Sequence, residues 1–197
     1  MALGPRGPPR VVRYTPARAV APAVSSQPCV SIVIATYNRR AVLTEVLDAL
    51  RHQTVRDWEA IVVGDACTDG TADAVARFGD ARLRFVNLPR NHGEQSVPNN
   101  EGVRLARADR LAFLNHDDFW RLDHLEHALA HLDRSGADLV YTWQASLLPD
   151  RTVVLLGPSP LGHYSTDLGI PASSWVWRRD LTTRIGPWRN GWTLRLA

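Results

Sequence analysis

Apolar and polar residues alternate along the chain with two different periods, and these periods predict the elements. Short apolar runs rich in β-branched residues predict buried strands at residues 30–35, 58–63, 83–86 and 111–114. Between these runs, apolar residues recur three and four positions apart, as in helices that bury one face. The predicted helices cover residues 42–50, 72–78, 96–108 and 122–132, and further strands are expected at residues 137–143 and 152–156.

The connections between successive strands are too long for hairpins, and each contains a predicted helix. We therefore predict an α/β domain with a mostly parallel central sheet and helices on both faces. In open sheets of this kind, ligands bind beyond the carboxyl ends of the strands. Polar residues stand at those ends at positions 36–39, at Asp65 and at positions 115–118. The sequence thus predicts three polar clusters at one edge of the sheet.

The last cluster, Asn115-His116-Asp117-Asp118, places adjacent carboxylates at the end of a strand. Carboxylate oxygens are the ligands that Mg²⁺ and Mn²⁺ prefer. Capping of the next helix is an alternative role, because Asp and Asn cap helices well. Separate capping roles would not require three clusters to converge, so the convergence favours a nucleotide-diphosphate site. Neither G-x-G-x-x-G after the first strand nor G-x-x-x-x-G-K-[ST] occurs, so a dinucleotide fingerprint or P-loop is unsupported.

Composition and charge narrow the class of protein. The chain has 197 residues, of which 45% are apolar and 22% charged, as in one globular domain. Its formal charge is only +3, and its basic residues are scattered arginines without any lysine, so we expect no nucleic-acid partner. Cys29 and Cys67 match neither a disulfide framework nor a zinc pattern, which favours a reducing compartment.

The sequence shows no pattern of a membrane span or a secretory signal. No apolar run approaches the roughly 18–20 residues of a membrane span, and the N-terminus lacks an apolar h-region. We expect a cytoplasmic protein without a transmembrane segment, and peripheral association with a membrane stays open. Residues 1–28 are rich in Pro and Arg and have no apolar period, so we predict a disordered tail before one domain at residues 29–197.

Five segments carry a resemblance to a known family. They are Ser-Ile-Val-Ile-Ala-Thr-Tyr-Asn-Arg (31–39), Val-Val-Gly-Asp-Ala-Cys-Thr-Asp-Gly-Thr (62–71), Asn-His-Gly (91–93), Asn-Glu-Gly (100–102) and Phe-Leu-Asn-His-Asp-Asp (113–118). In this order they resemble the family-2 glycosyltransferases, and a looser similarity extends through Trp188. The resemblance implies the Rossmann-like glycosyltransferase A fold, a nucleotide-sugar donor, and Mn²⁺ or Mg²⁺ as cofactor.

The resemblance also implies roles for single residues in donor binding. Thr36, Tyr37 and Arg39 match the loop that touches the nucleoside, and Asp65 matches the carboxylate that reads the edge of the base. Asn100 matches a helix start that supports the donor pocket. A base with an imide N–H needs a fixed acceptor, which an Asp at a strand end supplies.

The Asp-x-Asp motif of the family is altered in this chain. Asn115 and Asp117 fall on its two ends, with Asp117 as the expected cation ligand. Asn115 stands where the family usually has Asp, so the site carries one charge fewer, although an Asn can still bond a ribose hydroxyl. His116 lies between them, and we favour a packing or solvent-facing role for it over ligation.

The second departure from the family pattern concerns the carboxylate base, for which this chain shows no matching motif. Inverting members carry this base in an acidic motif beyond the segment that residues 175–188 resemble. Here the last Glu is Glu126, and the only acids after Asp150 are Asp167 and Asp180, which are weak candidates for the base. The chain ends nine residues after Trp188. We therefore expect an intact donor site and incomplete acceptor machinery.

Two functions follow from these observations. The first is a metal-assisted, inverting glycosyltransferase that uses a nucleotide sugar, UDP-linked by expectation, and a saccharide, lipid or protein acceptor. The alternative is a nucleotide-sugar-binding remnant or truncated protein without transferase activity. A nucleotidyltransferase on a related sheet is disfavoured, because no Gly-rich loop bearing Arg or Lys follows the first strand.

Overall fold

The computed structural model describes residues 26–157 and 170–189. Most of the predicted tail therefore lies outside the described residues, as does Asp167. None of the helices in the described part of the chain has the length and apolar character needed to cross a membrane.

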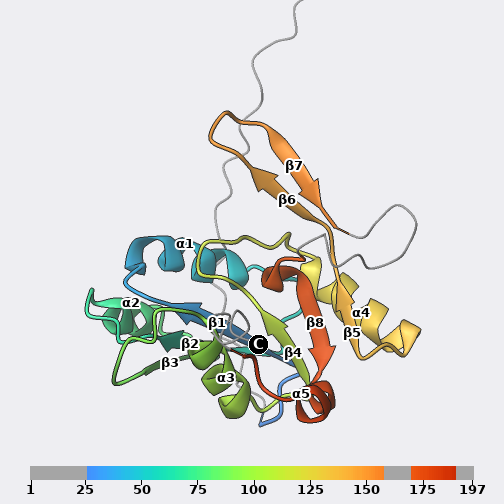
Figure 1. Ribbon diagram of the computed structural model, residues 1–197, viewed down its shortest axis with the longest axis horizontal. Helices are drawn as coiled ribbons and strands as arrows, with labels where there is room; N and C mark the ends of the chain where they lie inside the picture. Colours follow the sequence, from blue (N-terminus) through green and yellow to red (C-terminus); the bar gives the residue numbers. More distant parts are fainter. Residues whose placement is uncertain (1–25, 158–169, 190–197) are drawn as a thin grey trace, which may run out of the picture.

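One six-stranded sheet forms the centre of the domain, in the order β3-β2-β1-β4-β8-β5 (Figure 1). The parallel strands are β1 (Val30–Thr36), β2 (Trp58–Gly64), β3 (Leu83–Asn87) and β4 (Arg110–Phe113). β8 (Trp175–Arg178) runs antiparallel between β4 and β5 (Leu139–Tyr141). β6 (Gln144–Leu147) and β7 (Val153–Leu156) pair as a separate hairpin that projects from the body of the molecule. The predicted α/β class with a mostly parallel sheet is confirmed.

Helices cover both faces of this sheet. Side chains of α1 (Arg40–Leu50), α2 (Thr71–Arg77) and α4 (His124–Ser135) share one core cluster with Ile32 and Ile34 of β1. Side chains of α3 (Ser96–Leu105) and α5 (Arg179–Ile185) pack against the other cluster, which contains Val33. Because successive side chains of a strand point to opposite faces, the apolar run of β1 fills both cores.

The α3 helix lies unusually close to the sheet because of a glycine. A Cβ atom at Gly102 would lie 2.3 Å from Cγ1 of Val33, which is closer than two carbon atoms can approach. Gly102 therefore allows the helix backbone to rest against β1.

The strand order places a topological switch point at the centre of the sheet. The chain passes from β1 outward to β2 and β3, and then returns to add β4 on the other side of β1. Connections leave the carboxyl ends of β1 and β4 in opposite directions, which opens a crevice where ligands bind in such folds. The polar clusters predicted at residues 36–39 and 115–118 follow these two strands.

Three features of the described elements differ from the prediction. The helix expected over residues 96–108 ends at Leu105, because the next N–H groups bond elsewhere: Ala108 N donates to Ser31 Oγ at 2.9 Å. The strand expected over residues 137–143 is two strands, β5 and β6, in different sheets. β8 follows the short 3-10 helix η1 (Ala172–Ser174) and was not predicted as a strand.

A buried carboxylate, Glu59, joins the strands at the edge opposite the switch-point crevice. It accepts hydrogen bonds from Ser31 Oγ at 2.6 Å, from Arg107 N at 2.7 Å and from Arg107 Nε at 2.8 Å. Burial alone would raise the pKa of the Glu59 carboxyl, but the bonds from Ser31 and Arg107 hold it below its usual value. The charged form of Glu59 therefore stabilises the fold.

We predict that Glu59→Gln lowers the free energy of unfolding by about 3 kcal/mol at pH 7, because an amide NH₂ would face donors at a buried site. The folded pKa of Glu59 lies below the unfolded value of about 4.3, so its contribution is complete above that pH and is lost as the pH falls further. Urea denaturation at several pH values should show a weaker acid dependence in the variant. Glu45→Gln, at an exposed position of α1, is the control. Identical stability of both variants would contradict the assignment.

Candidate functional site

The end of β1, at the topological switch point of the sheet, carries polar side chains that lack a hydrogen-bond partner among the described residues. Thr36 is buried, and its hydroxyl has no hydrogen-bond partner among the described residues. Buried hydroxyls without partners are rare, and such a group commonly bonds to a ligand or to water. Tyr37, 49% exposed, and the exposed Arg39 follow, and neither side chain bonds to any residue that the structure describes. All three are residues predicted to touch the nucleoside.

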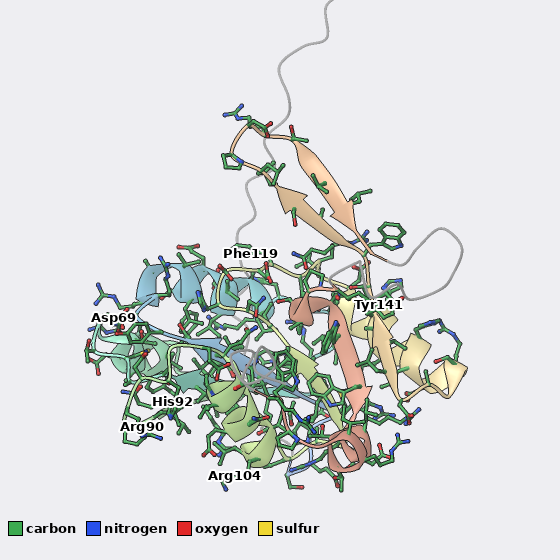
Figure 2. All side chains as sticks on the ribbon, in the orientation of Figure 1. Asp69, Arg90, His92, Arg104, Phe119 and Tyr141 are labelled. Carbon is green, nitrogen blue, oxygen red and sulfur yellow. The ribbon has the colours of Figure 1, made fainter. Side chains whose placement is uncertain are left out.

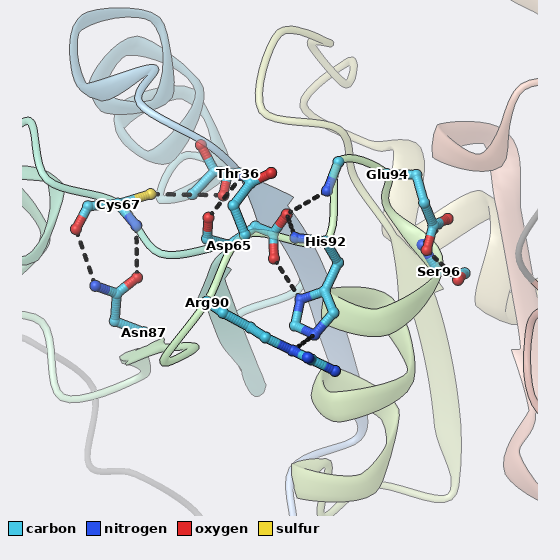
Figure 3. Close-up of polar contacts among 10 residues, drawn as sticks. Thr36, Asp65, Cys67, Asn87, Arg90, His92, Glu94 and Ser96 are labelled. Atoms are coloured by element: carbon cyan, nitrogen blue, oxygen red, sulfur yellow. Dashed lines mark hydrogen bonds and ion pairs between the residues drawn. The ribbon is translucent and has the colours of Figure 1, made fainter.

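Asp65 follows β2 and organises the neighbouring loop (Figure 3). Its backbone N–H donates to the Thr36 carbonyl at 2.8 Å, which ties it to β1. Asp65 is only 4% exposed, and its carboxylate accepts from His92 N at 2.8 Å, from His92 Nδ1 at 2.8 Å and from Gly93 N at 3.3 Å. A carboxylate has about four lone-pair positions. Three are used within the protein, which leaves one for a ligand.

His92 connects this carboxylate to an arginine. Arg90 Nε donates to His92 Nε2 at 3.3 Å, while His92 Nδ1 faces Asp65. The two contacts fit an imidazole that carries its hydrogen on Nδ1. Figure 2 places His92 and Arg90 beside the β2–β3 side of the sheet, in the loop that enters α3. At the level of sequence, residues 91–93 served only as part of the family resemblance, and no role was predicted for His92.

The loop between β2 and α2 is fixed by side chains that sequence reasoning missed. Asn87 Oδ1 accepts from Cys67 N at 2.8 Å, and Asn87 Nδ2 donates to Cys67 O at 2.9 Å. Asp69 accepts from the Arg40 N–H at 2.9 Å, at the start of α1. The signal for Asn87 is its place as the last residue of β3, directly after the apolar run predicted as a strand over residues 83–86. The contacts of Asn87 hold the loop to the end of β3, and the contact of Asp69 holds it to the start of α1.

The two carboxylates after β4 have different surroundings. Asp118 Oδ2 accepts from Asn115 Nδ2 at 2.8 Å and from Ser173 Oγ at 2.6 Å. Asp117 is exposed and has no partner among the described residues. Asn115 N also donates to Ser173 Oγ, at 2.9 Å. Asp118 thus holds the loop in place, and Asp117 is free to bind a ligand.

The structure permits a cation only if the substrate shares in its coordination. His116 Nδ1 lies 3.1 Å from the Ala35 carbonyl oxygen, in keeping with the packing role favoured from the sequence. In the described part of the chain, no group of three or more His, Cys, Asp or Glu side chains is arranged to hold a metal ion. Mg²⁺ and Mn²⁺ bound with nucleotides typically take one or two carboxylates, with phosphate and water completing the shell. Asp117 fits that arrangement.

Two other predicted residues, Asn100 and Asp180, lie away from the polar residues 115–118. The Asn100 side chain donates to Trp188 O at 2.9 Å and accepts from Trp188 N at 2.9 Å, within α3 rather than at its start. Asp180 lies in the first turn of α5, 3.9 Å from Arg184. Because Arg178 pairs with Arg110 at the amino end of β4, Asp180 is at the opposite edge of the sheet from Asp117. The structure does not bring Asp180 to the site.

Sequence comparison places the chain among known proteins. Residues 31–152 match the family model described as glycosyl transferase family 2. The chain is 29% identical over 195 residues to validoxylamine A glucosyltransferase of Streptomyces hygroscopicus subsp. jinggangensis, which covers 89% of this chain and 45% of that protein. It is 32% identical over 118 residues to the succinoglycan biosynthesis protein ExoO of Rhizobium meliloti, with 60% and 34% covered.

Solved structures share the fold at 23% sequence identity. Staphylococcus aureus TarS 1-349 in complex with UDP-GlcNAc superposes with a TM-score of 0.65, over 79% of this chain and 47% of that one. The mannosyltransferase PcManGT from Pyrobaculum calidifontis, in complex with GDP-Man and Mn²⁺, superposes with a TM-score of 0.66, over 86% and 50%. The fold is therefore the glycosyltransferase A fold. The chain spans half or less of the length of these curated relatives.

We predict that Asp65→Asn lowers the free energy of unfolding by about 1–3 kcal/mol, because an amide NH₂ would face the donors of His92 and Gly93. Urea denaturation at pH 7 measures this loss. Asp73→Asn, at an exposed position of α2, is the matched control and should change stability little. A variant at Asp65 as stable as the wild type would show that the carboxylate does not hold the 91–93 turn.

Proposed function

This chain belongs to glycosyl transferase family 2, and we propose that it binds a nucleoside-diphosphate sugar at the carboxyl ends of β1, β2 and β4, for transfer to an acceptor with inversion. The observation that carries the proposal is the set of unpartnered groups at one edge of the sheet. These groups are the Thr36 hydroxyl, the side chains of Tyr37 and Arg39, and the Asp117 carboxylate. They stand at the switch point, where such sheets bind nucleotides.

Each side of the crevice would hold a different part of the donor. Thr36, Tyr37 and Arg39 would contact the nucleoside, and the remaining lone pair of Asp65 would accept from an imide N–H of the base. UDP carries such a base, which supports a UDP-linked donor. The Asn115 side-chain oxygen, Oδ1, accepts no hydrogen bond from the described residues and would accept from a ribose hydroxyl.

Asp117 would hold Mn²⁺ or Mg²⁺ together with the diphosphate of the donor. When bound, the cation supplies positive charge that opposes the charge developing on the departing diphosphate. Asp118 would keep the loop in position through Ser173. Inversion further requires a base for the acceptor hydroxyl. Asp167 remains a candidate from the sequence and lies outside the described residues.

A second function is favoured by the position of Asp180. Because this acid lies at the far edge of the sheet, it cannot reach an acceptor beside Asp117 in this arrangement. Donor binding without transfer by this chain is therefore the alternative. Incubation with UDP-sugars and measurement of transfer or hydrolysis, beside measurement of binding, separates the two functions.

We predict that Asp117→Ala removes the dependence of UDP binding on Mn²⁺. The wild type should bind UDP more tightly with Mn²⁺ than without, whereas the variant should bind equally in both conditions because the protein ligand is gone. Isothermal titration calorimetry with UDP, with and without Mn²⁺, measures the effect. Asp73→Ala on α2 is the control and should keep the metal dependence. An Asp117→Ala protein that still responds to Mn²⁺ would overturn the assigned ligand.

Base recognition by Asp65 gives a separate prediction. Asp65→Asn should weaken UDP binding about 10-fold, as a mismatched buried polar contact does. CDP has no imide N–H, so its affinity should change less and the preference for UDP over CDP should shrink. Equal losses for both nucleotides would mean that Asp65 acts only by holding the 91–93 turn.

A further inference from the structure

A concave region lies beside Asp117 and Asp118, on the side of the β6–β7 hairpin. It is a cleft of about 750 Å³ between the start of α4, the hairpin and the residues before β8. Asp117 and Asp118 line it, whereas Thr36 and Asp65 do not. Phe119, labelled in Figure 2, also belongs to its lining. Its volume is in the range of small-molecule sites, and it is separate from the proposed nucleoside contacts.

Two side chains of this cleft hold polar atoms that lack partners. His124 Nε2 and Gln144 Oε1 are buried and make no hydrogen bond with any described residue. Burial lowers the pKa of His124 to about 4, although the neighbouring Asp123 acts in the opposite direction. The ring is therefore neutral at pH 7, with one donor and one acceptor nitrogen. Native structures rarely leave such groups unpaired without a ligand or water to pair them.

Aromatic rings fixed by the protein form other parts of the lining. Trp120 stacks on His124 with ring centroids 4.4 Å apart, and its Nε1 donates to the Ser173 carbonyl at 2.6 Å. Trp143 is 57% exposed, and the backbone of Gly157 packs against its ring. A Cβ atom at Gly157 would lie 2.4 Å from Trp143 Cε3. The absence of a side chain at Gly157 thus allows the chain to pass close to the exposed indole of Trp143.

We propose that this cleft binds a sugar ring of the acceptor, an inference that rests on the proposed function. A pyranose presents an apolar C–H face and a rim of hydroxyl groups. The tryptophan rings suit the first, and the amide and imidazole suit the second. An acyl chain would leave His124 and Gln144 unpaired. Asp117 lines this cleft and is also one of the groups proposed to bind the donor. A sugar bound in the cleft would therefore have a hydroxyl near the donor.

The test measures saccharide binding by the 197-residue chain in the presence of UDP and Mn²⁺. The probes are methyl β-glycosides of glucose, galactose, mannose and N-acetylglucosamine, followed by ligand-observed NMR titration. Gln144→Leu removes the amide, and His124→Phe removes the ring nitrogens while keeping a flat ring against Trp120. Each should weaken binding of the best glycoside at least 5-fold and leave UDP affinity within 2-fold. His131→Phe, at an exposed position of α4, is the control and should bind as the wild type does.

The outcomes separate this inference from the proposed function. Glycoside affinities that are equal in the wild type and both folded variants overturn the subsite, as does a wild type that binds UDP but no glycoside. Absence of UDP binding overturns the proposed function instead, while the glycoside titrations without UDP still decide the subsite. If Gln144→Leu weakens UDP-sugar binding but not UDP or glycoside binding, the cleft holds the sugar of the donor, and the acceptor assignment is wrong. Circular dichroism checks folding, and His124→Phe decides if Gln144→Leu does not fold.

Discussion

The arrangement of the loops at the carboxyl ends of β1 and β2 depends on the hydrogen bonds of one buried carboxylate, Asp65. Parallel strands pair along their lengths, but beyond their carboxyl ends the chain leaves in loops that the sheet does not hold. Asp65 holds these loops through its N–H, which binds the end of β1, and its carboxylate, which binds two N–H groups and the His92 ring after β3. Charge-assisted bonds at a site this buried are stronger than neutral ones. These bonds thus join the end of β1, the end of β2 and the segment after β3.

Much of the fold could be predicted from the sequence, because its signals are local. The strands β1 to β4 are apolar runs, the helices between them have a clear period, and both were predicted within a few residues. The family was also identified, since its motifs sit at the strand ends. The end of α3 was wrong because Glu59, far away in the sequence, attracts the N–H of Arg107. β8 is short and is recognised only by its pairing with β4 and β5.

Some residues of the site could be selected from local sequence signals, whereas others come from distant segments and could not. Thr36, Asp65 and Asn115 could be selected because each follows a strand. Ser173 could not, since its contact with Asp118 joins residues 55 positions apart and requires the antiparallel return of the chain through η1 and β8. The cleft beside α4 is formed likewise, by segments that no single motif contains. Sequence reasoning therefore selects residues at the ends of β1, β2 and β4 and misses the cleft on the other side of Asp117.

The substitution of Asn for Asp at position 115 has a physical reason in this chain. Asn115 Nδ2 donates to Asp118 Oδ2, which also accepts from Ser173 Oγ. An aspartate at position 115 could not donate that bond, and its charge would repel Asp118. The amide thus stabilises Asp118 as a structural carboxylate, and Asp117 is left as the unpartnered acid of the cluster. In the proposed function, a cation, the diphosphate and the acceptor would meet at Asp117 alone, and metal affinity would depend on the donor more strongly than in a site with two free carboxylates.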